Sequence, residues 1–240
     1  KCLEKSGGVI AAIADTHTNE NGYFIGIDLG HTTHGEEDFS NLATVIFDHH
    51  GLLIGHTIEK GIPRKENLLE IHCITAFKKL AGILTKNNLP PPKSLVIHRD
   101  GKLHSTDITS LTNAIRIIWG EITVDIVEII KSGFPVIAMK NDKGAAITPP
   151  SGNSYQDNDH KYSILVTNIQ AEEQSAVVSP IIIKHKFGNT AFNKIVDQVY
   201  WFTKIYTNNL YNSTRLPATT LKANNIVGTS KKQHKSTYLG

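Results

Sequence analysis

Two aspartates end apolar runs that would otherwise be buried throughout. Asp28 ends the run "YFIGID" and Asp100 ends the run "LVIHRD". A single aspartate at a strand end is most often a turn residue, but two of them converge if their strands are neighbours in one sheet. Converging carboxylates repel each other unless a cation lies between them, and hard oxygen ligands favour Mg²⁺ or Mn²⁺. Two such ions, roughly 3.5–4 Å apart, activate water and stabilise the leaving oxygen of a phosphodiester.

A second motif offers a different metal chemistry. The run "IFDHHGLLIGH" matches the signature of DHH-type phosphoesterases, which bind Mn²⁺ and cleave phosphodiesters or pyrophosphate. Its mixed nitrogen and oxygen ligands would come from Asp48, His49 and His50, with His31 or His34 upstream. The further Asp and His motifs of that family are not found here, and Gly51 followed by "LLIGHTI" favours a hairpin turn. We therefore interpret the motif as a turn and keep the phosphoesterase as an alternative.

Length and composition set limits on the kind of protein. The 240 residues fit one large domain or two small ones, and 40% apolar with 20% charged residues is ordinary for a soluble globular protein. No apolar run reaches the roughly 20 residues that span a bilayer, and the start lacks the apolar region of a secretory signal. Cys2 and Cys73 form neither a disulfide framework nor a zinc cluster. We expect a cytoplasmic protein without a membrane segment.

The charge is distributed unevenly along the chain. The net charge is +3, but no acidic residue follows Asp197. The basic residues after that point are Lys204, Arg215, Lys222, Lys231, Lys232 and Lys235. A basic segment of this kind suits a polyanion, because contacts to phosphates release counterions. A solvated basic tail is the alternative interpretation.

The apolar pattern predicts the elements that position these residues. Strands are expected at 23–30, twice within 41–61, and at 94–101, 134–142, 162–168 and 177–186. Helices are expected at 65–86, 105–118 and 190–211. The stretch 123–133 fits a strand or a helix, and 141–161 a loop or ragged hairpin. This order predicts a mixed α/β sheet, and neither a GxGxxG nor a GxxxxGK[ST] motif is present.

Five segments together resemble one known family. They are "GIDLG", "HRDG", "VVSPIIIK", "VDQVYWFTKIYTNN" and "STRLPATTLKANN". The chain resembles the PIWI domain of prokaryotic-type Argonaute proteins, from about Gly7 to Gly228, and the last segment is the most specific match. The resemblance implies a ribonuclease H-like mixed sheet flanked by helices, with the PIWI domain at 21–240. Residues 1–20 would be the end of a preceding MID-like segment.

The family's cleavage site holds an aspartate, a glutamate, a second aspartate and a variable fourth ligand. Asp28 matches the first aspartate and Asp100 the second. The glutamate lies in a mobile loop before the helix that precedes the second aspartate, and Glu66 in "PRKENLLE" fits that place. Glu59 and Glu70 are the alternatives.

The fourth ligand falls on Asn224 in "LKANN", with Asn225 as a one-residue alternative. An amide oxygen can coordinate Mg²⁺, but it is uncharged and binds more weakly than a carboxylate. The resemblance implies catalysis by Asp28, Glu66, Asp100 and Asn224, with Mg²⁺ or Mn²⁺ held by the two aspartates and Asn224.

The resemblance also implies contacts to nucleic acid. Arg215 in "TRLP" matches a family residue close to guide phosphates, and a guanidinium binds a phosphate with two hydrogen bonds. Lys222 is a phosphate candidate because of its charge. The implied partners are a short guide strand, RNA or DNA, its complementary target strand, and MID and other Argonaute domains on the same or an associated chain.

The function expected from the resemblance is guide-directed binding and metal-dependent endonucleolytic cleavage of the complementary strand. Three alternatives remain open. The first is a catalytically inactive guide-binding module that works with a partner effector. The second is a ribonuclease H-like nuclease that needs no guide, and the third is the DHH-type phosphoesterase.

Overall fold

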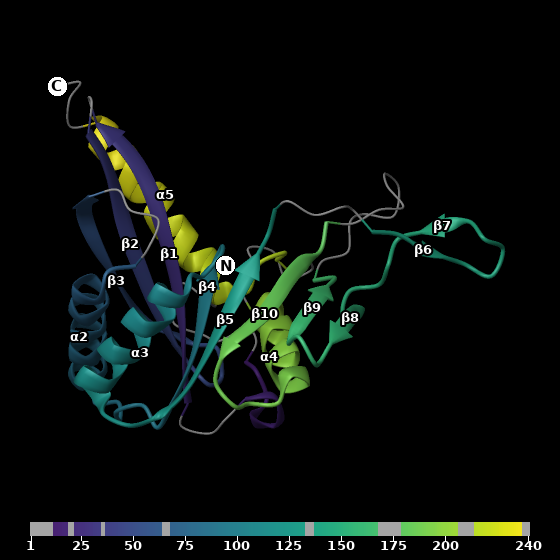
Figure 1. Ribbon diagram of the computed structural model, residues 1–240, viewed down its shortest axis with the longest axis horizontal. Helices are drawn as coiled ribbons and strands as arrows, with labels where there is room; N and C mark the ends of the chain where they lie inside the picture. The colour runs from purple at the N-terminus through teal and green to yellow at the C-terminus, as the bar shows by residue number, and fades with distance from the viewer. Residues whose placement is uncertain are drawn as a thin grey trace, which may run out of the picture.

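An eight-stranded mixed sheet forms the centre of the molecule (Figure 1), with strand order β3-β2-β1-β4-β5-β10-β9-β8. The computed structural model describes residues 12–18, 22–34, 37–63, 68–132, 137–167, 179–205 and 214–236. The strands of the sheet are β1 (Gly22–His34), β2 (Glu37–Asp48), β3 (Leu53–Pro63), β4 (Ser94–Asp100), β5 (Thr123–Ile130), β8 (Ser154–Asp157), β9 (Tyr162–Leu165) and β10 (Ile181–Phe187).

Strand direction changes in the middle of the sheet. β1, β2 and β3 form an antiparallel meander, while β4 pairs parallel to β1 and β5 pairs parallel to β4. β10 returns antiparallel to β5 and continues to β9 and β8. The three central strands β1, β4 and β5 are therefore parallel, and the carboxyl end of β4, at Asp100, lies level with Asp28 in β1.

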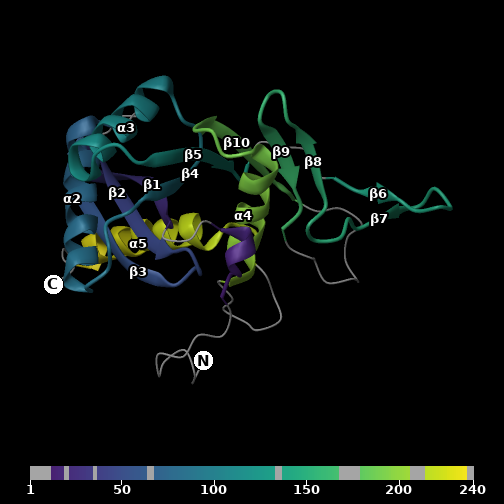
Figure 2. The same ribbon diagram turned by 90° about the horizontal axis from the view of Figure 1, so that it is seen from below.

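Alternating side chains of the strands build two cores, one on each face. In β1, Ile25 and Ile27 pack on one face, whereas Phe24 packs on the other. The first face is covered by α2 (Glu70–Lys86) and α3 (Ser105–Trp119), and the second by α4 (Phe192–Ile205) and α5 (Ala218–Ser236) (Figures 1 and 2).

The helices bury residues at the spacing that the sequence predicts. α2 buries Cys73, Ala76, Phe77, Leu80 and Leu84, which lie three or four residues apart. α4 buries Ile195, Val199 and Phe202 in the same way. The end of the helix expected at 190–211, from residue 206 on, lies outside the described residues.

The expected mixed α/β sheet is confirmed, with three differences in detail. The ambiguous stretch 123–133 contains strand β5. The buried strand expected at 134–142 is wrong, because in its described part β6 (Met139–Lys140) is exposed and pairs with β7 (Ala146–Ile147) in a small hairpin outside the main sheet (Figure 1). No element was predicted for the region of α5.

Among the described residues, no helix combines the length and the apolar character that a membrane crossing requires.

Candidate functional site

The register of β1 and β4 brings Asp28 and Asp100 side by side. Each residue of β1 pairs with the residue 72 positions later on β4, up to Ile27 and Arg99. Asp28 and Asp100 are the next pair in this register, and neighbouring strands are about 4.8 Å apart. The condition set by the sequence, that the two strands be neighbours, is therefore met.

Both aspartates point to the face of the sheet covered by α5. On β1, a Cβ atom added to Gly26 would lie 2.2 Å from the backbone oxygen of Thr219 in α5. On β4, His98 Nδ1 lies 2.8 Å from Thr219 Oγ1. Asp28 and Asp100 are two residues beyond Gly26 and His98, and side chains two apart in a strand share a face.

Burial and mutual repulsion dominate the electrostatics of this pair. Desolvation raises the pKa of the Asp28 carboxyl, and the charge of Asp100 raises it further. Two cations oppose this effect. Arg99 Nη1 lies 3.6 Å from Asp28 Oδ1, and Lys131 Nζ donates to Asp100 Oδ2 at 2.6 Å.

The two cations differ in how firmly they are held. Arg99 is buried, donates from Nη1 to the backbone oxygen of Asp100, and its pKa is lowered by desolvation. Lys131 follows the end of β5, and its side chain is 38% exposed. The side chain of Lys131 is therefore less enclosed by the protein than that of Arg99.

The donor set fits a hard divalent cation. Asp28 and Asp100 offer carboxylate oxygens from one face of the sheet, and a cation bound between them would oppose the effects of burial and of Asp100 that raise the pKa of Asp28. Lys131 already places a positive charge on Asp100, as a metal ion would. Oxygen ligands of this kind suit Mg²⁺ or Mn²⁺.

Asn224 lies on α5 at the level of Asp28. α5 runs in the same direction as β1 (Figure 1), and its first turn packs on Gly26 through Thr219. Five residues of helix from Thr219 to Asn224 rise about 7.5 Å, close to the roughly 7 Å from Gly26 to Asp28 along a strand. Asn224 is half-buried and Asn225 is exposed, so the geometry favours Asn224 as the residue beside the sheet.

Glu66 lies outside the described residues, and the chain is described again from Leu68, two residues later. The backbone N–H of Leu68 donates to Asp107 Oδ1 at 2.7 Å, and Leu68 packs in the core beneath α2 and α3. The two alternative glutamates have other partners. Glu59 accepts a hydrogen bond from Lys79 at 2.6 Å, and Glu70 accepts one from Asn113 at 2.9 Å.

The basic residues expected to contact phosphates have different surroundings. Arg215 is half-buried, and its Nη2 donates to the backbone oxygens of Lys131 at 2.5 Å and Pro180 at 2.8 Å. Burial lowers the pKa of this guanidinium. Lys204 also points inward, where it donates to Ser151 Oγ at 2.6 Å.

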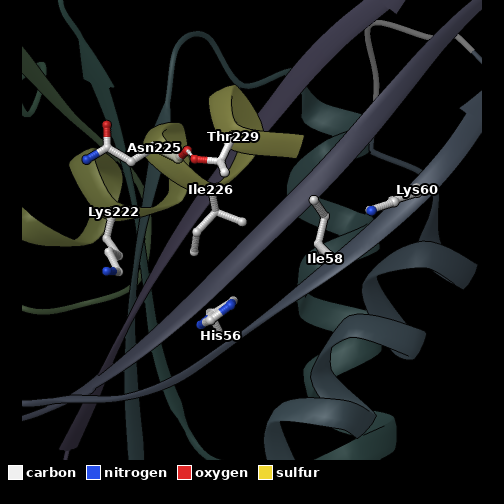
Figure 3. Close-up of a pocket in the computed structure, with 7 residues that line it drawn as sticks. All are labelled: His56, Ile58, Lys60, Lys222, Asn225, Ile226 and Thr229. Atoms are coloured by element: carbon white, nitrogen blue, oxygen red, sulfur yellow. Dashed lines mark hydrogen bonds between the residues drawn. The ribbon is translucent and has the colours of Figure 1, made fainter. Parts of the chain in front are cut away.

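Lys222 opens into a pocket between α5 and β3 (Figure 3). The pocket holds about 300 Å³ and is lined by His56, Ile58, Lys60, Lys222, Asn225, Ile226 and Thr229. The β3 residues of this pocket lie on the same face of the sheet as Asp28, because their partners on β2, Ala43 and Val45, pack in the core beneath α5. The pocket therefore adds positive charge to the face that carries the two aspartates.

The DHH motif forms the hairpin turn that its glycine predicts. Gly51 has φ +83°, and Asp48 Oδ1 accepts a hydrogen bond from the backbone N–H of Leu52 at 2.8 Å. His31, one of the upstream candidates, lies 2.9 Å from Ser40 Oγ through its Nδ1. Asp48 thus acts as a turn residue.

Comparison with solved structures identifies the fold of this chain. No family model matches the sequence, and neither does any curated protein. Among solved structures, the Argonaute of Clostridium butyricum, bound to a guide DNA and a 19-mer target DNA, matches with a TM-score of 0.76 and 26% identity. That match covers 96% of this chain and 29% of that one. The chain has a PIWI-like Argonaute fold.

Two further Argonautes share this PIWI-like fold. The Aquifex aeolicus Argonaute matches with a TM-score of 0.72 and 20% identity over 95% of this chain and 31% of that chain. The Marinitoga piezophila Argonaute, in complex with a 5′ OH guide RNA and target DNA, matches with a TM-score of 0.61 and 22% identity. That match covers 87% of this chain and 30% of that chain. The chain thus spans less than a third of each of these proteins.

Two residues of the site were not predicted from the sequence. Arg99 stands beside Asp100 in "HRDG", and only its type could have suggested a role. Lys131 is 31 residues from Asp100 and meets it only because β4 and β5 are parallel neighbours. Cys73 is buried, and desolvation raises its pKa to about 12.

Proposed function

We propose that this PIWI-like domain binds a short guide strand paired to a target and cleaves the target endonucleolytically with Mg²⁺ or Mn²⁺. The observation that carries the proposal is the pair Asp28 and Asp100, side by side on parallel strands and facing α5. The fold neighbours that hold guide and target strands support the same class of ligand.

Four residues of the chain would form the catalytic set. Asp28 and Asp100 would hold the metal ions with Asn224, and Glu66 would complete the set from the segment between β3 and α2. When bound, the metal ions would supply water of lowered pKa and stabilise the charge on the leaving oxygen. Lys131 would move away from Asp100 and remain a nearby positive charge for the phosphodiester.

The protein would grip the paired strands through their backbones, and base pairing would supply the sequence specificity. Lys222 and Lys60, at the pocket of Figure 3, are proposed as phosphate contacts. Arg215 is proposed as a second contact, from a guanidinium already oriented by the backbone of Lys131 and Pro180.

MID and the other Argonaute domains would lie on the same or an associated chain. We propose that residues 1–20 form the end of a MID-like segment and that 21–240 form the PIWI domain. The coverage of less than a third of each neighbouring Argonaute agrees with this division.

A cleavage assay tests the proposal directly. The chain, with a short guide and either a matched or a mismatched labelled target, is incubated with and without Mn²⁺. We expect cleavage only of the matched target and only with the metal, and loss of cleavage in Asp100→Ala. Asp157→Ala, in an exposed strand far along the sheet, is the matched control and should cleave as the wild type does.

A silent guide-binding module is the second candidate, and two observations favour it. Lys131 neutralises Asp100, and Asn224 contributes no charge to the metal ions. In that case matched target binds with guide-dependent affinity but is not cut in Mg²⁺ or Mn²⁺. Cleavage that ignores complementarity would instead indicate a nuclease that needs no guide.

A further inference from the structure

A second group of metal-ligand side chains lies at the other end of the sheet from Asp28 and Asp100. The β2–β3 turn carries His49 and His50, and the short 3-10 helix η1 (Asp15–His17) places Asp15 against them. Within the described ranges, this is the group of at least three His, Cys, Asp or Glu side chains whose ligand atoms lie close enough together, within 4.8 Å, to hold one ion.

The distances in this group do not correspond to hydrogen bonds. His49 Nε2 lies 3.5 Å and His50 Nδ1 lies 3.6 Å from the same carboxylate oxygen, Asp15 Oδ1. A contact of 3.6 Å is too long for a hydrogen bond. Ligand atoms at 2.0–2.1 Å from a tetrahedral ion are about 3.3–3.4 Å apart, so the two distances from Asp15 Oδ1 already nearly match those around an ion, and all three atoms lie within 4.8 Å of one another.

The backbone holds these three residues in place. Gly51, with φ +83°, closes the turn that brings the rings of His49 and His50 to a centroid distance of 3.8 Å. The backbone N–H of Ile13 donates to the carbonyl oxygen of His50 at 2.9 Å, which ties the segment of Asp15 to the turn.

The other end of η1 is held by His17, which contacts two residues of α4. His17 Nδ1 lies 2.6 Å from Asp197 Oδ2 on α4, and the His17 ring packs 4.6 Å from that of Trp201. His17 is therefore engaged elsewhere, and Asp15 remains directed at the turn. His50 Nδ1 also lies 3.2 Å from the carbonyl oxygen of Ile13, a long hydrogen bond that metal binding would replace.

We propose that Asp15, His49 and His50 form a binding site for a transition-metal ion of the zinc class, separate from the proposed cleavage site. Two imidazoles and one carboxylate are ligands that suit Zn²⁺, whereas Mg²⁺ and Mn²⁺ favour oxygen. The side chains of His49, His50 and Asp15 are 23%, 39% and 55% exposed, so an ion can reach them from solvent.

A bound ion would clamp the segment before β1 onto the β2–β3 hairpin. Asp15 and the two histidines are joined in this region by backbone pairing of Ile13 with His50 and by the long contact of His50 with Ile13. Binding to the folded chain alone would stabilise it in proportion to the free metal concentration. The role of the ion here is structural, and the proposal is independent of guide binding and cleavage.

The test uses the full chain without an affinity tag, stripped of metal and kept in excess Mg²⁺. Zn²⁺ is titrated by calorimetry, and Co²⁺ binding is followed by its visible absorption. We expect one Zn²⁺ per chain, a higher thermal midpoint, and slower hydrogen exchange at the Ile13 amide. His49→Ala and Asp15→Asn should each weaken binding by at least about tenfold, the loss that outer-shell changes alone can cause.

The matched control is His160→Ala, which removes an exposed histidine paired at 2.8 Å with Asp157 on β8. It should bind Zn²⁺ as the wild type does. Asp15→Asn keeps the test decisive if the histidine variants fold poorly, because Asp15 is exposed and the substitution preserves its shape. Equal affinity in wild type, His49→Ala and Asp15→Asn, or no binding by wild type, would overturn the proposal.

Discussion

The two ends of the sheet each gather ligand side chains, but of different chemical character. At the carboxyl end of β4 and the level of β1 beside it, the buried carboxylates of Asp100 and Asp28 lie beside the cations Arg99 and Lys131. At the β2–β3 turn, two histidines and Asp15 are partly exposed. The contrast shows that burial and ligand type separate two candidate metal sites on one scaffold, one for hard ions and one for softer ions.

The largest expected difference between the two ends concerns cleavage. Asp28→Ala or Asp100→Ala should reduce the single-turnover cleavage rate by about a thousandfold, because metal ions contribute several kcal/mol to such transition states. His49→Ala and His50→Ala should leave the rate within about threefold of wild type, a free-energy change below 1 kcal/mol. The assay is guide-directed cleavage in Mn²⁺, and the opposite ranking would favour the DHH-type phosphoesterase.

The next largest expected effect is on stability, at the close contact between Gly26 of β1 and Thr219 of α5. In Gly26→Ala the new Cβ would lie 2.2 Å from the backbone oxygen of Thr219, so α5 must shift away from β1. We expect a loss of about 1–3 kcal/mol in the free energy of unfolding, as for overpacked cores, and slower cleavage because Asn224 moves with the helix.

Gly228→Ala is the control for that variant, since an added Cβ there meets nothing within 4 Å. Alanine in a helix is more stable than glycine by roughly 0.5–1 kcal/mol, so this variant should be as stable as wild type or more stable. Urea unfolding of both variants checks the pair. Equal stability of Gly26→Ala and wild type would show that α5 is not held at this contact.

Lowering the pH should reduce the free energy of unfolding, because the buried His98 stays neutral in the folded protein. Burial lowers the pKa of His98 from 6.5 to about 3, so the folded protein keeps this imidazole neutral. As pH falls from about 6.5 to about 3, the unfolded chain alone takes up a proton, and stability is lost at up to about 1.4 kcal/mol per pH unit. In urea unfolding at pH 7 and pH 5.5, His98→Gln should show a smaller loss than wild type, and equal losses would contradict this origin.

The smallest expected effect concerns the burial of Asp28 and its repulsion by Asp100, which both raise the pKa of its carboxyl. Since the pKa of Asp28 is raised in the folded protein, ionised Asp28 weakens folding, and stability falls as pH rises through its folded pKa. Without added metal, Asp28→Asn should therefore raise the thermal midpoint at pH 7, by about 2–4 °C for each kcal/mol relieved in a chain of this size. The gain should disappear near pH 3, and a gain that persists there would point to a different cause.

The proximity of Asp28 and Asp100 could be predicted from the sequence, because it follows from the order of the strands in the sheet. Asp28 and Asp100 end apolar runs, and placing those runs as neighbours is enough to bring the carboxylates together. The position of Asn224 required the resemblance, since Thr219, Thr220 and the two asparagines are weak helix formers that hide α5 from propensity arguments.

Other features depend on contacts that no local pattern contains. Lys131 reaches Asp100 from the neighbouring strand, and Asp15 meets His49, which lies 34 positions later in the sequence. The wrong strand at 134–142 has a related cause. An apolar run predicts burial only if another element covers it, and Met139 instead lies exposed in a small hairpin.

His98 and Asp100 stand on the same strand, and that has a mechanical consequence. His98 links β4 to the first turn of α5 through its 2.8 Å contact with Thr219. Asp100, two residues later on the same strand, carries one carboxylate of the candidate site. A sliding motion of β4 would carry the helix with it. The contact between His98 and Thr219 therefore links the strand that carries Asp100 to the start of the helix that carries Asn224.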